Sequence, residues 1–180
     1  AYRPIGLMQH ALKLVEVVLL HFLHEETATF QPESQGGFRW SRGCRDHLLR
    51  LRLIIDRCLQ LGQSAVICLL DFRGAFDTVS HRRLDAALKQ AGATRKTRAI
   101  FRAILKSAHG VVRSREADGS FTFSDAFDIS RGNVQGALAS PWGFITTIAS
   151  ILLDADEHPD LDYEIRRACV DLKTGRRNSE

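Results

Sequence analysis

The sequence predicts an α+β fold from three observations. Residues 65–71 form a continuous apolar run that ends in aspartate, which is the pattern of a strand buried on both faces. Residues 111–115 and 120–123 flank an Asp118-Gly119 pair, which is typical of a β-hairpin. Most other apolar segments are bounded by helix caps and stop signals. We therefore expect helices that cover one face of a small sheet.

Two helices are predicted before the strand. Residues 9–24 are apolar almost all round, with a thin polar line through Glu16, so this helix should be mostly buried. A loop follows over residues 25–43, which contain proline and two consecutive glycines. The second helix covers residues 46–61 and is closed by Gly62, in the position of a left-handed cap.

Three helices are predicted after the strand. Ser80 can cap a helix that runs to residue 91, and Thr94 can cap the next one, which ends before Gly110. After the hairpin, Ser140 and Pro141 provide a cap and a first-turn proline for a helix that reaches about residue 153.

The charge is divided unevenly along the chain. Residues 1–115 hold 19 Lys/Arg against 9 Asp/Glu, whereas residues 116–180 hold 6 against 12. A basic block of this size attracts polyanions, so nucleic acid or an anionic surface is a candidate partner. Arginines on solvated helix faces are the alternative explanation of the same composition.

The cysteines and the apolar segments restrict the class of protein. Cys44, Cys58, Cys68 and Cys169 show no zinc-ligand spacing and fit a reducing compartment. The most apolar stretch, residues 14–23, is shorter than the roughly 20 residues that span a bilayer, and it lacks the features of a signal peptide. We expect an intracellular protein, nuclear or cytoplasmic, that is neither secreted nor in a membrane. The first residue is not Met, which predicts a trimmed start or an excerpt of a longer protein.

Asp71 is the first candidate for chemistry. A carboxylate at the end of a rigid strand suits a divalent cation, because the strand limits its motion. Magnesium takes one or two protein carboxylates together with phosphate oxygens and waters. A lone aspartate at a strand end is more often a cap for the following turn.

The segment that contains Asp71 is one of four segments that resemble known sequence motifs, and the four occur in the order of those motifs. Residues 70–84 read LDFRGAFDTVSHRRL and residues 131–141 read RGNVQGALASP. Upstream, residues 2–7 read YRPIGL and residues 34–39 read SQGGFR. These segments resemble, respectively, motif A, motif B and two fingers motifs of the reverse transcriptases of non-LTR (LINE-like) retrotransposons.

The resemblance implies a right-hand polymerase fragment that lacks the thumb. Residues 1–62 would be partial fingers, residues 63–153 an incomplete split β-α-β (ferredoxin-like) palm, and residues 154–180 a divergent tail, acidic and then basic. The implied activity is RNA-directed DNA polymerisation, a two-metal nucleotidyl transfer with Mg²⁺ or Mn²⁺. RNA template, DNA primer and deoxynucleoside triphosphate are the implied partners.

The resemblance also implies residue roles. Asp71 would be the catalytic metal ligand, and the Phe72 carbonyl would contact the metal on the nucleotide side. Phe76 would crowd a ribose 2′-hydroxyl, although core packing is the ordinary role of phenylalanine. Gln135 and Gly136 would lie under the nucleotide and the template. The remaining implied contacts are Arg3 with the triphosphate and Gln35, Gly37, Phe38 and Arg39 with the template.

Two nearby polar residues are assigned structural roles. We expect Asp77 to accept hydrogen bonds from backbone amides at a helix start. His81 should be a packed or capping histidine rather than a general base.

The second carboxylate pair of a two-metal site is missing from this sequence. The family's Asp-Asp hairpin follows motif B, and no Asp-Asp pair occurs here. The nearest candidate, Asp171, lacks the second aspartate and the preceding aromatic residue. We therefore expect a fragment that is inactive alone. A non-catalytic nucleic-acid-binding module derived from such an enzyme is the main alternative, and a helical scaffold with no nucleic-acid role is a third.

Overall fold

The computed structural model describes residues 8–67 and 69–156. The elements are α1 (His10–Thr27), the 3-10 helix η1 (Ala28–Phe30), α2 (Cys44–Gln60), α3 (Ala75–Thr78), α4 (His81–Gln90), α5 (Arg95–Lys106), β1 (His109–Gly110), β2 (Arg113–Arg115), β3 (Phe121–Phe123), β4 (Phe127–Asp128) and α6 (Ser140–Asp156). Mixed helices and small sheets agree with the expected α+β class. Within the described ranges, no helix has the length and apolar character needed to cross a membrane.

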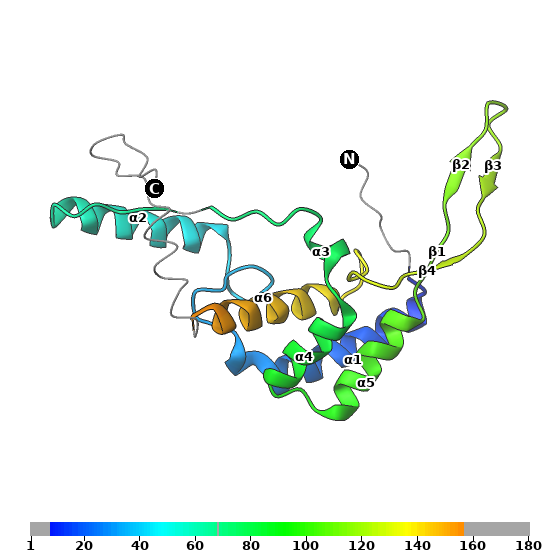
Figure 1. The fold of residues 1–180 in the computed structure, drawn as a ribbon, viewed down its shortest axis with the longest axis horizontal. Coiled ribbons are helices and arrows are strands. Elements are labelled where there is room, and N and C mark those ends of the chain that lie inside the picture. The colour runs from blue at the N-terminus through cyan, green and yellow to red at the C-terminus, as the bar shows by residue number, and fades with distance from the viewer. Residues whose placement is uncertain (1–7, 68, 157–180) are drawn as a thin grey trace, which may run out of the picture.

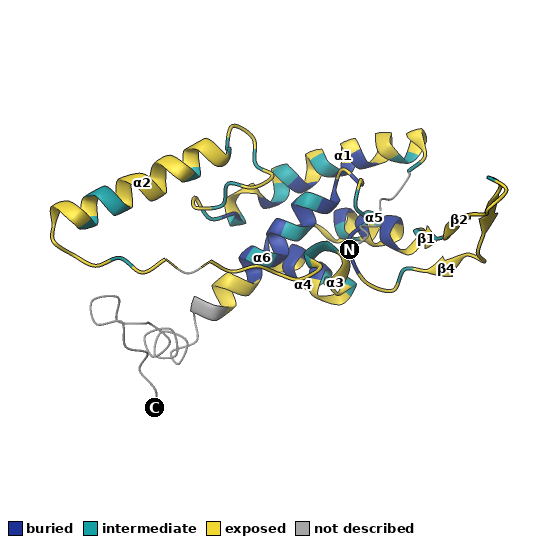
Figure 2. Ribbon diagram, turned by 90° about the horizontal axis from the view of Figure 1, so that it is seen from above, coloured by how far each residue is buried: buried dark blue, intermediate teal, exposed yellow. Residues whose placement is uncertain are grey.

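The core lies where α1, α4, α5 and α6 meet (Figures 1 and 2). Leu84 of α4, Phe101 of α5 and Trp142 of α6 are among its buried side chains. A Cβ added to Gly143 would lie 3.0 Å from both Leu84 and Phe101, so the missing side chain lets α6 approach its neighbours closely. Each large side chain buried here contributes about 1.5–3 kcal/mol of transfer free energy.

Helix α1 is buried on one side only. Its buried residues, Glu16, Leu19, Leu23 and Thr27, recur every three or four positions. Several of its other apolar side chains are exposed to solvent, Leu14 among them, while Leu12 and Leu20 are partly buried against the core. The expectation of a mostly buried helix was therefore wrong, because α5 and α6 cover a single face.

The predicted helix ends are confirmed where short signals define them. Gly62 and Gly92 follow α2 and α4 with φ of +63° and +97°, the left-handed region that favours glycine. The Thr94 hydroxyl accepts a hydrogen bond from the Thr97 amide at the start of α5. Ser140 was expected to precede the last predicted helix as its cap. In the structure it is the first residue of α6, so the helix begins one residue earlier.

The predicted buried strand at residues 65–71 is wrong. The described part of this segment has no strand, and its apolar side chains are exposed, Leu69 by 91%. An apolar run forms a buried strand only where neighbouring strands pair with it, and none of the described residues does so. The split β-α-β palm sheet is accordingly not present in the described ranges, and the division at residue 62 stays a prediction.

The predicted hairpin is confirmed. Strands β2 and β3 pair antiparallel, and Gly119 has the φ of +86° that the turn requires. The chain enters and leaves this hairpin through β1 and β4, which also pair antiparallel. The hairpin extends from one end of the molecule and α2 from the other (Figure 1). No residue of α2 is buried, as Figure 2 shows.

Candidate active site

Two segments that are far apart in the sequence line one pocket of ≈ 650 Å³. Residues 71–77 form one side, and residues 134–137 with Ser140 and Pro141 form the other. The structure thus brings together five of the predicted site residues, which are Asp71, Phe72, Phe76, Gln135 and Gly136. Arg3 lies outside the described residues.

Backbone contacts at Gly132 join the two sides of the pocket. The Gly132 amide donates to the Val79 carbonyl, and the Asn133 amide donates to the Phe76 carbonyl, both at 2.7 Å. Gly132 has φ of +91°, and a Cβ there would lie 2.8 Å from the Asp77 carbonyl oxygen. Only glycine combines this conformation with so close a backbone approach.

Side chains reinforce the same junction. The Gln135 Nε2 donates to Asp77 Oδ1 at 3.1 Å, so Asp77 meets a side-chain amide from the opposite segment rather than the backbone amides we expected. The His81 Nε2 donates to the Gly132 carbonyl at 2.8 Å. This hydrogen bond gives His81 a structural contact, in line with its predicted role.

Phe76 lies in an aromatic cluster at the pocket. Its ring stacks on Phe144 of α6 with centroids 4.7 Å apart, and Phe38 meets it edge-on at 6.1 Å. The Phe76 side chain is half-buried, while its residue also lines the pocket. The cluster therefore connects the predicted template segment around Phe38 with the pocket residue Phe76 and with α6.

Asp71 is an exposed pocket residue. Among the described residues, no cationic side chain lies within ion-pair distance of its carboxylate. No group of three or more His, Cys, Asp or Glu able to hold a metal occurs in the described ranges. A carboxylate such as that of Asp71 is the type of protein oxygen ligand that magnesium takes beside phosphate oxygens and waters. Asp71 and the Phe72 carbonyl alone do not fit a two-metal centre.

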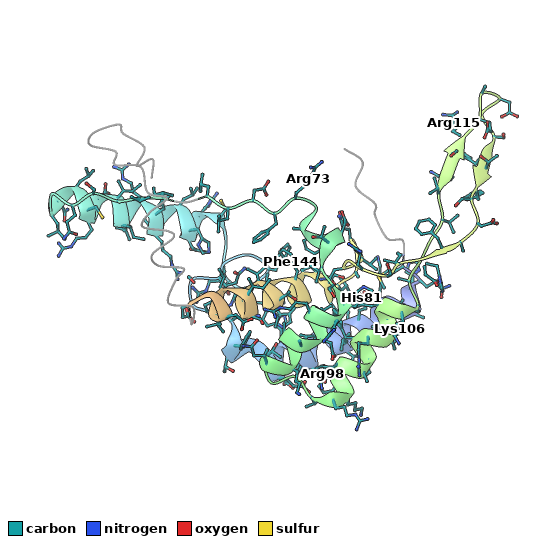
Figure 3. All side chains as sticks on the ribbon, in the orientation of Figure 1. Arg73, His81, Arg98, Lys106, Arg115 and Phe144 are labelled. Carbon is teal, nitrogen blue, oxygen red and sulfur yellow. The ribbon has the colours of Figure 1, made fainter. Side chains whose placement is uncertain are left out.

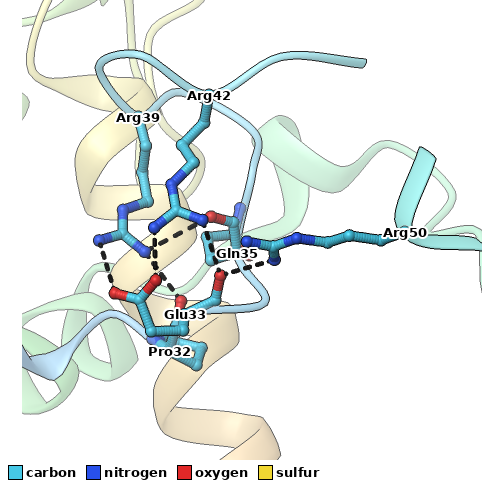
Figure 4. Close-up of polar contacts among 6 residues, drawn as sticks. All are labelled: Pro32, Glu33, Gln35, Arg39, Arg42 and Arg50. Carbon is cyan, nitrogen blue, oxygen red and sulfur yellow. Dashed lines mark hydrogen bonds and ion pairs between the residues drawn. The ribbon is translucent and has the colours of Figure 1, made fainter. Parts of the chain in front are cut away.

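The predicted template segment is organised around Glu33 (Figure 4). Its carboxylate pairs with Arg42 and lies 3.9 Å from Arg39, and its backbone carbonyl accepts from Arg50 at 3.0 Å. The hydrogen bond and charge of Arg42 hold the pKa of Glu33 below its ordinary value. Arg39 also donates to the Pro32 carbonyl at 2.9 Å, so its guanidinium is used within the loop.

Gln35, Gly37 and Phe38 belong to the same loop. The Gln35 side chain donates a hydrogen bond to the Gly37 carbonyl at 3.2 Å, and this bond stabilises the turn. Phe38 has φ of +56°, an uncommon conformation for a residue with a side chain, and it presents an exposed ring. The template contacts of these residues remain predictions.

Glu16 was not predicted to take part in the site. Its side chain is 1% exposed within α1, and its carboxylate accepts from the amide of Leu138, in the loop that carries Gln135 and Gly136. Burial raises the pKa of Glu16, which the backbone hydrogen bonds from Leu138 and Ala139 partly oppose. A lone acid in an apolar helix was the only signal in the sequence, and it did not identify the partner.

Glu16 should make stability depend on pH in the sense opposite to a salt-bridged carboxylate. Because its folded-state pKa lies above 4.5, its contribution is most favourable below that pH and declines as pH rises through the folded value. We expect Glu16→Gln to remove this decline, since the amide oxygen still accepts from Leu138. Glu16→Ala should cost about 1–3 kcal/mol at low pH by leaving that amide without its acceptor, and this cost should shrink as pH rises. Urea unfolding over a pH series that starts below 4.5 measures both variants. A Glu16→Gln variant whose free energy of unfolding declines with pH as steeply as that of the wild type would contradict this expectation.

Comparison with known proteins identifies the family of the chain. The family model for reverse transcriptase (RNA-dependent DNA polymerase) matches residues 1–168. No curated protein and no solved structure gives a significant match. The matched range includes both segments of the pocket and the loop of residues 31–43. The chain therefore belongs to the reverse transcriptase (RNA-dependent DNA polymerase) family.

Proposed function

We propose that this chain is the fingers and palm part of a non-LTR (LINE-like) reverse transcriptase, and that its pocket receives the incoming deoxynucleoside triphosphate opposite an RNA template. The observation that carries the proposal is the junction at Gly132. It places Asp71, Phe76 and Gln135 around one pocket although more than fifty residues separate the two segments. A polymerase needs this arrangement, because catalysis consists mainly of positioning and charge stabilisation.

Each pocket residue has a role that suits its surroundings. Asp71 is exposed, and with the Phe72 carbonyl it would hold Mg²⁺ or Mn²⁺, which would supply charge neutralisation for the phosphates. The Phe76 ring stacks on Phe144, and this contact would hold it where it excludes a 2′-hydroxyl. Gly136, with φ of +102°, and Gln135 form the opposite side of the pocket.

The carboxylates of the pocket are too few for turnover. Asp77 is the other acid in the pocket lining, and Gln135 already binds it. The sequence has no Asp-Asp pair that would complete the centre. Two-metal catalysis needs ligands for ions about 3.5–4 Å apart, and one free aspartate does not provide them.

We expect the chain to bind a magnesium–deoxynucleotide complex but not to extend a primer on an RNA template. Binding is measured by the anisotropy of a fluorescent deoxynucleoside triphosphate with and without Mg²⁺. Asp71→Asn should weaken the magnesium-dependent binding roughly tenfold or more, as losses around metal ligands do. Asp125→Asn, at an exposed residue outside the pocket, is the matched control. Magnesium-dependent binding that is equal in the two variants would refute the proposed site, and primer extension that depends on Asp71 would refute the predicted inactivity.

A non-catalytic nucleic-acid-binding module is a second candidate function. It is favoured by exposed arginines outside the pocket, in particular Arg113 and Arg115 on the hairpin. The two functions differ in what they require. A binding module needs neither Asp71 nor magnesium, so the nucleotide assay separates them.

A further inference from the structure

The β2–β3 hairpin has two chemically different faces. Arg113 pairs with Phe123 and Arg115 pairs with Phe121 across the two strands, so these four side chains share one face. Between them, Ser114 pairs with Thr122 and presents the opposite face. One face therefore alternates guanidinium and phenyl groups, and the other carries hydroxyl groups.

The acidic residues of the hairpin do not neutralise the arginine face. Glu116 accepts a hydrogen bond from the Thr122 hydroxyl at 2.8 Å, which places its carboxylate with the hydroxyl face. Asp118 accepts a hydrogen bond from the Ser120 amide at 2.8 Å within the turn. Hydrogen bonds from the Ser120 side chain and from this amide lower the pKa of Asp118. Both acids thus stabilise the turn and leave the other face cationic.

The arginine–phenylalanine face is not packed against the rest of the described molecule. Phe121 is 50% and Phe123 is 66% exposed. The Arg113 guanidinium lies over the Phe121 ring, 4.6 Å from its centroid, in a cation–π contact. Among the described residues, neither Arg113 nor Arg115 has an ion-pair partner, in contrast to the loop arginines gathered around Glu33.

The position of the hairpin gives a strand of nucleic acid free access. It projects beyond the end of α5, where Lys106 lies, and Arg115 is near its outer end, well away from Phe144, which packs against the pocket residue Phe76 (Figure 3). An isolated two-stranded hairpin with apolar exposed rings is marginal in water, so a ligand that covers the rings would also stabilise it.

We propose that this face, Arg113, Arg115, Phe121 and Phe123, is an accessory binding site for single-stranded nucleic acid. Bases stack on the two phenyl rings while the guanidinium groups contact the phosphates between them. Residues two apart on a strand are about 7 Å apart, so the two guanidinium groups lie close enough together to contact phosphates of one nucleic-acid strand. A duplex hides the faces of its bases, and an acidic peptide leaves the rings without a stacking partner. The charge and the rings together favour a single strand.

The test is binding of a fluorescein-labelled single-stranded oligonucleotide, measured by anisotropy over a salt series without magnesium or nucleotide. Phe121→Thr/Phe123→Thr should weaken binding roughly tenfold or more, since each stacked base contributes, and should leave the salt slope unchanged. Arg113→Gln/Arg115→Gln should reduce the slope of log K against log salt by about 1.4, the value for two contacts on a single strand. Arg95→Gln/Lys96→Gln removes the same charge from exposed residues at the far end of α5 and should leave the slope unchanged.

The outcomes separate this site from the pocket and from other partners. Far-UV circular dichroism of each variant checks the fold, which should persist because the four side chains are outside the core. The proposal would be overturned if the hairpin variants and the control variant lost the same amount of oligonucleotide affinity. It would also be overturned if a blunt duplex bound more tightly than a single strand. Binding of an acidic peptide in place of the oligonucleotide would overturn it as well. Failure of nucleotide binding at Asp71 would leave this site standing, because the assay uses neither magnesium nor nucleotide.

Discussion

Replacing Gly132 with alanine is expected to cost the folded protein about 2–4 kcal/mol and to open the pocket. Two penalties combine. The φ of +91° is strained for any residue with a side chain, at about 1–3 kcal/mol. The added Cβ would also lie 2.8 Å, 3.0 Å and 3.1 Å from backbone atoms of Asp77, which cannot rotate away as a flexible side chain would. Relief requires the two sides of the pocket to separate.

Gly62→Ala is the matched control for this substitution. Gly62 also has positive φ, +63°, but nothing lies within 4 Å of an added Cβ. It should therefore suffer the conformational penalty alone, about 1–2 kcal/mol. Thermal unfolding resolves the difference, because 1 kcal/mol shifts the melting temperature by about 2–4 °C in a chain of this size. Equal shifts for the two variants would mean that the contact with Asp77 is not tight.

The elements that sequence analysis predicted correctly depend on a few neighbouring residues. A left-handed glycine ended α2 at Gly62, a threonine hydroxyl began α5 at Thr94, and Asp118-Gly119 turned the hairpin. Each of these signals acts through contacts within about four residues, so the local sequence contains the whole cause. The strand at residues 65–71 failed for the complementary reason. Its apolar pattern presupposes pairing strands that the described residues do not supply.

The pocket was predicted only in part, and for a different reason. The residues that line it were predicted from resemblance to known sequence motifs. They were not predicted from the spacing of apolar residues. The junction at Gly132 could not be derived, since the Asp77 backbone that demands glycine is distant in sequence. Glu16 is a similar case. Its partner, the Leu138 amide, is 122 positions away, and a buried acid is interpretable only once its acceptor role is seen.

Asp71→Ala should abolish synthesis in a version of the chain completed with the family's Asp-Asp hairpin and thumb. We expect a loss of at least about a thousandfold in primer extension on RNA, because the metal ions supply several kcal/mol of transition-state stabilisation. The fold should be unaffected, since the Asp71 side chain is exposed and outside the core. Asp125→Ala in the same completed chain is the control and should retain full synthesis.

Phe76→Ala in the completed chain should instead change which sugar is accepted. The half-buried ring fills space at the pocket, so its removal should admit ribonucleoside triphosphates while synthesis with deoxynucleotides continues. The stability cost should stay below the roughly 3–5 kcal/mol of a fully buried phenylalanine, because the ring is only half-buried, against Phe144 and Phe38. Incorporation of each nucleotide and urea unfolding of the same variant measure the two effects together.

Phe144→Ala distinguishes a sugar gate from simple packing. Phe144 supports the Phe76 ring from α6 but is not part of the pocket lining. If Phe76 acts as a gate, loss of this support should loosen sugar selection partially, between the wild-type and Phe76→Ala values. If Phe76 is only a core residue, both substitutions should lower stability and neither should alter the ratio of ribonucleotide to deoxynucleotide incorporation. If Phe76→Ala unfolds the protein and Phe144→Ala leaves sugar selection unchanged, Phe76 is a core residue and does not belong to the site. Asp71 would then be the only residue of the segment 70–84 whose side chain retains a proposed chemical role.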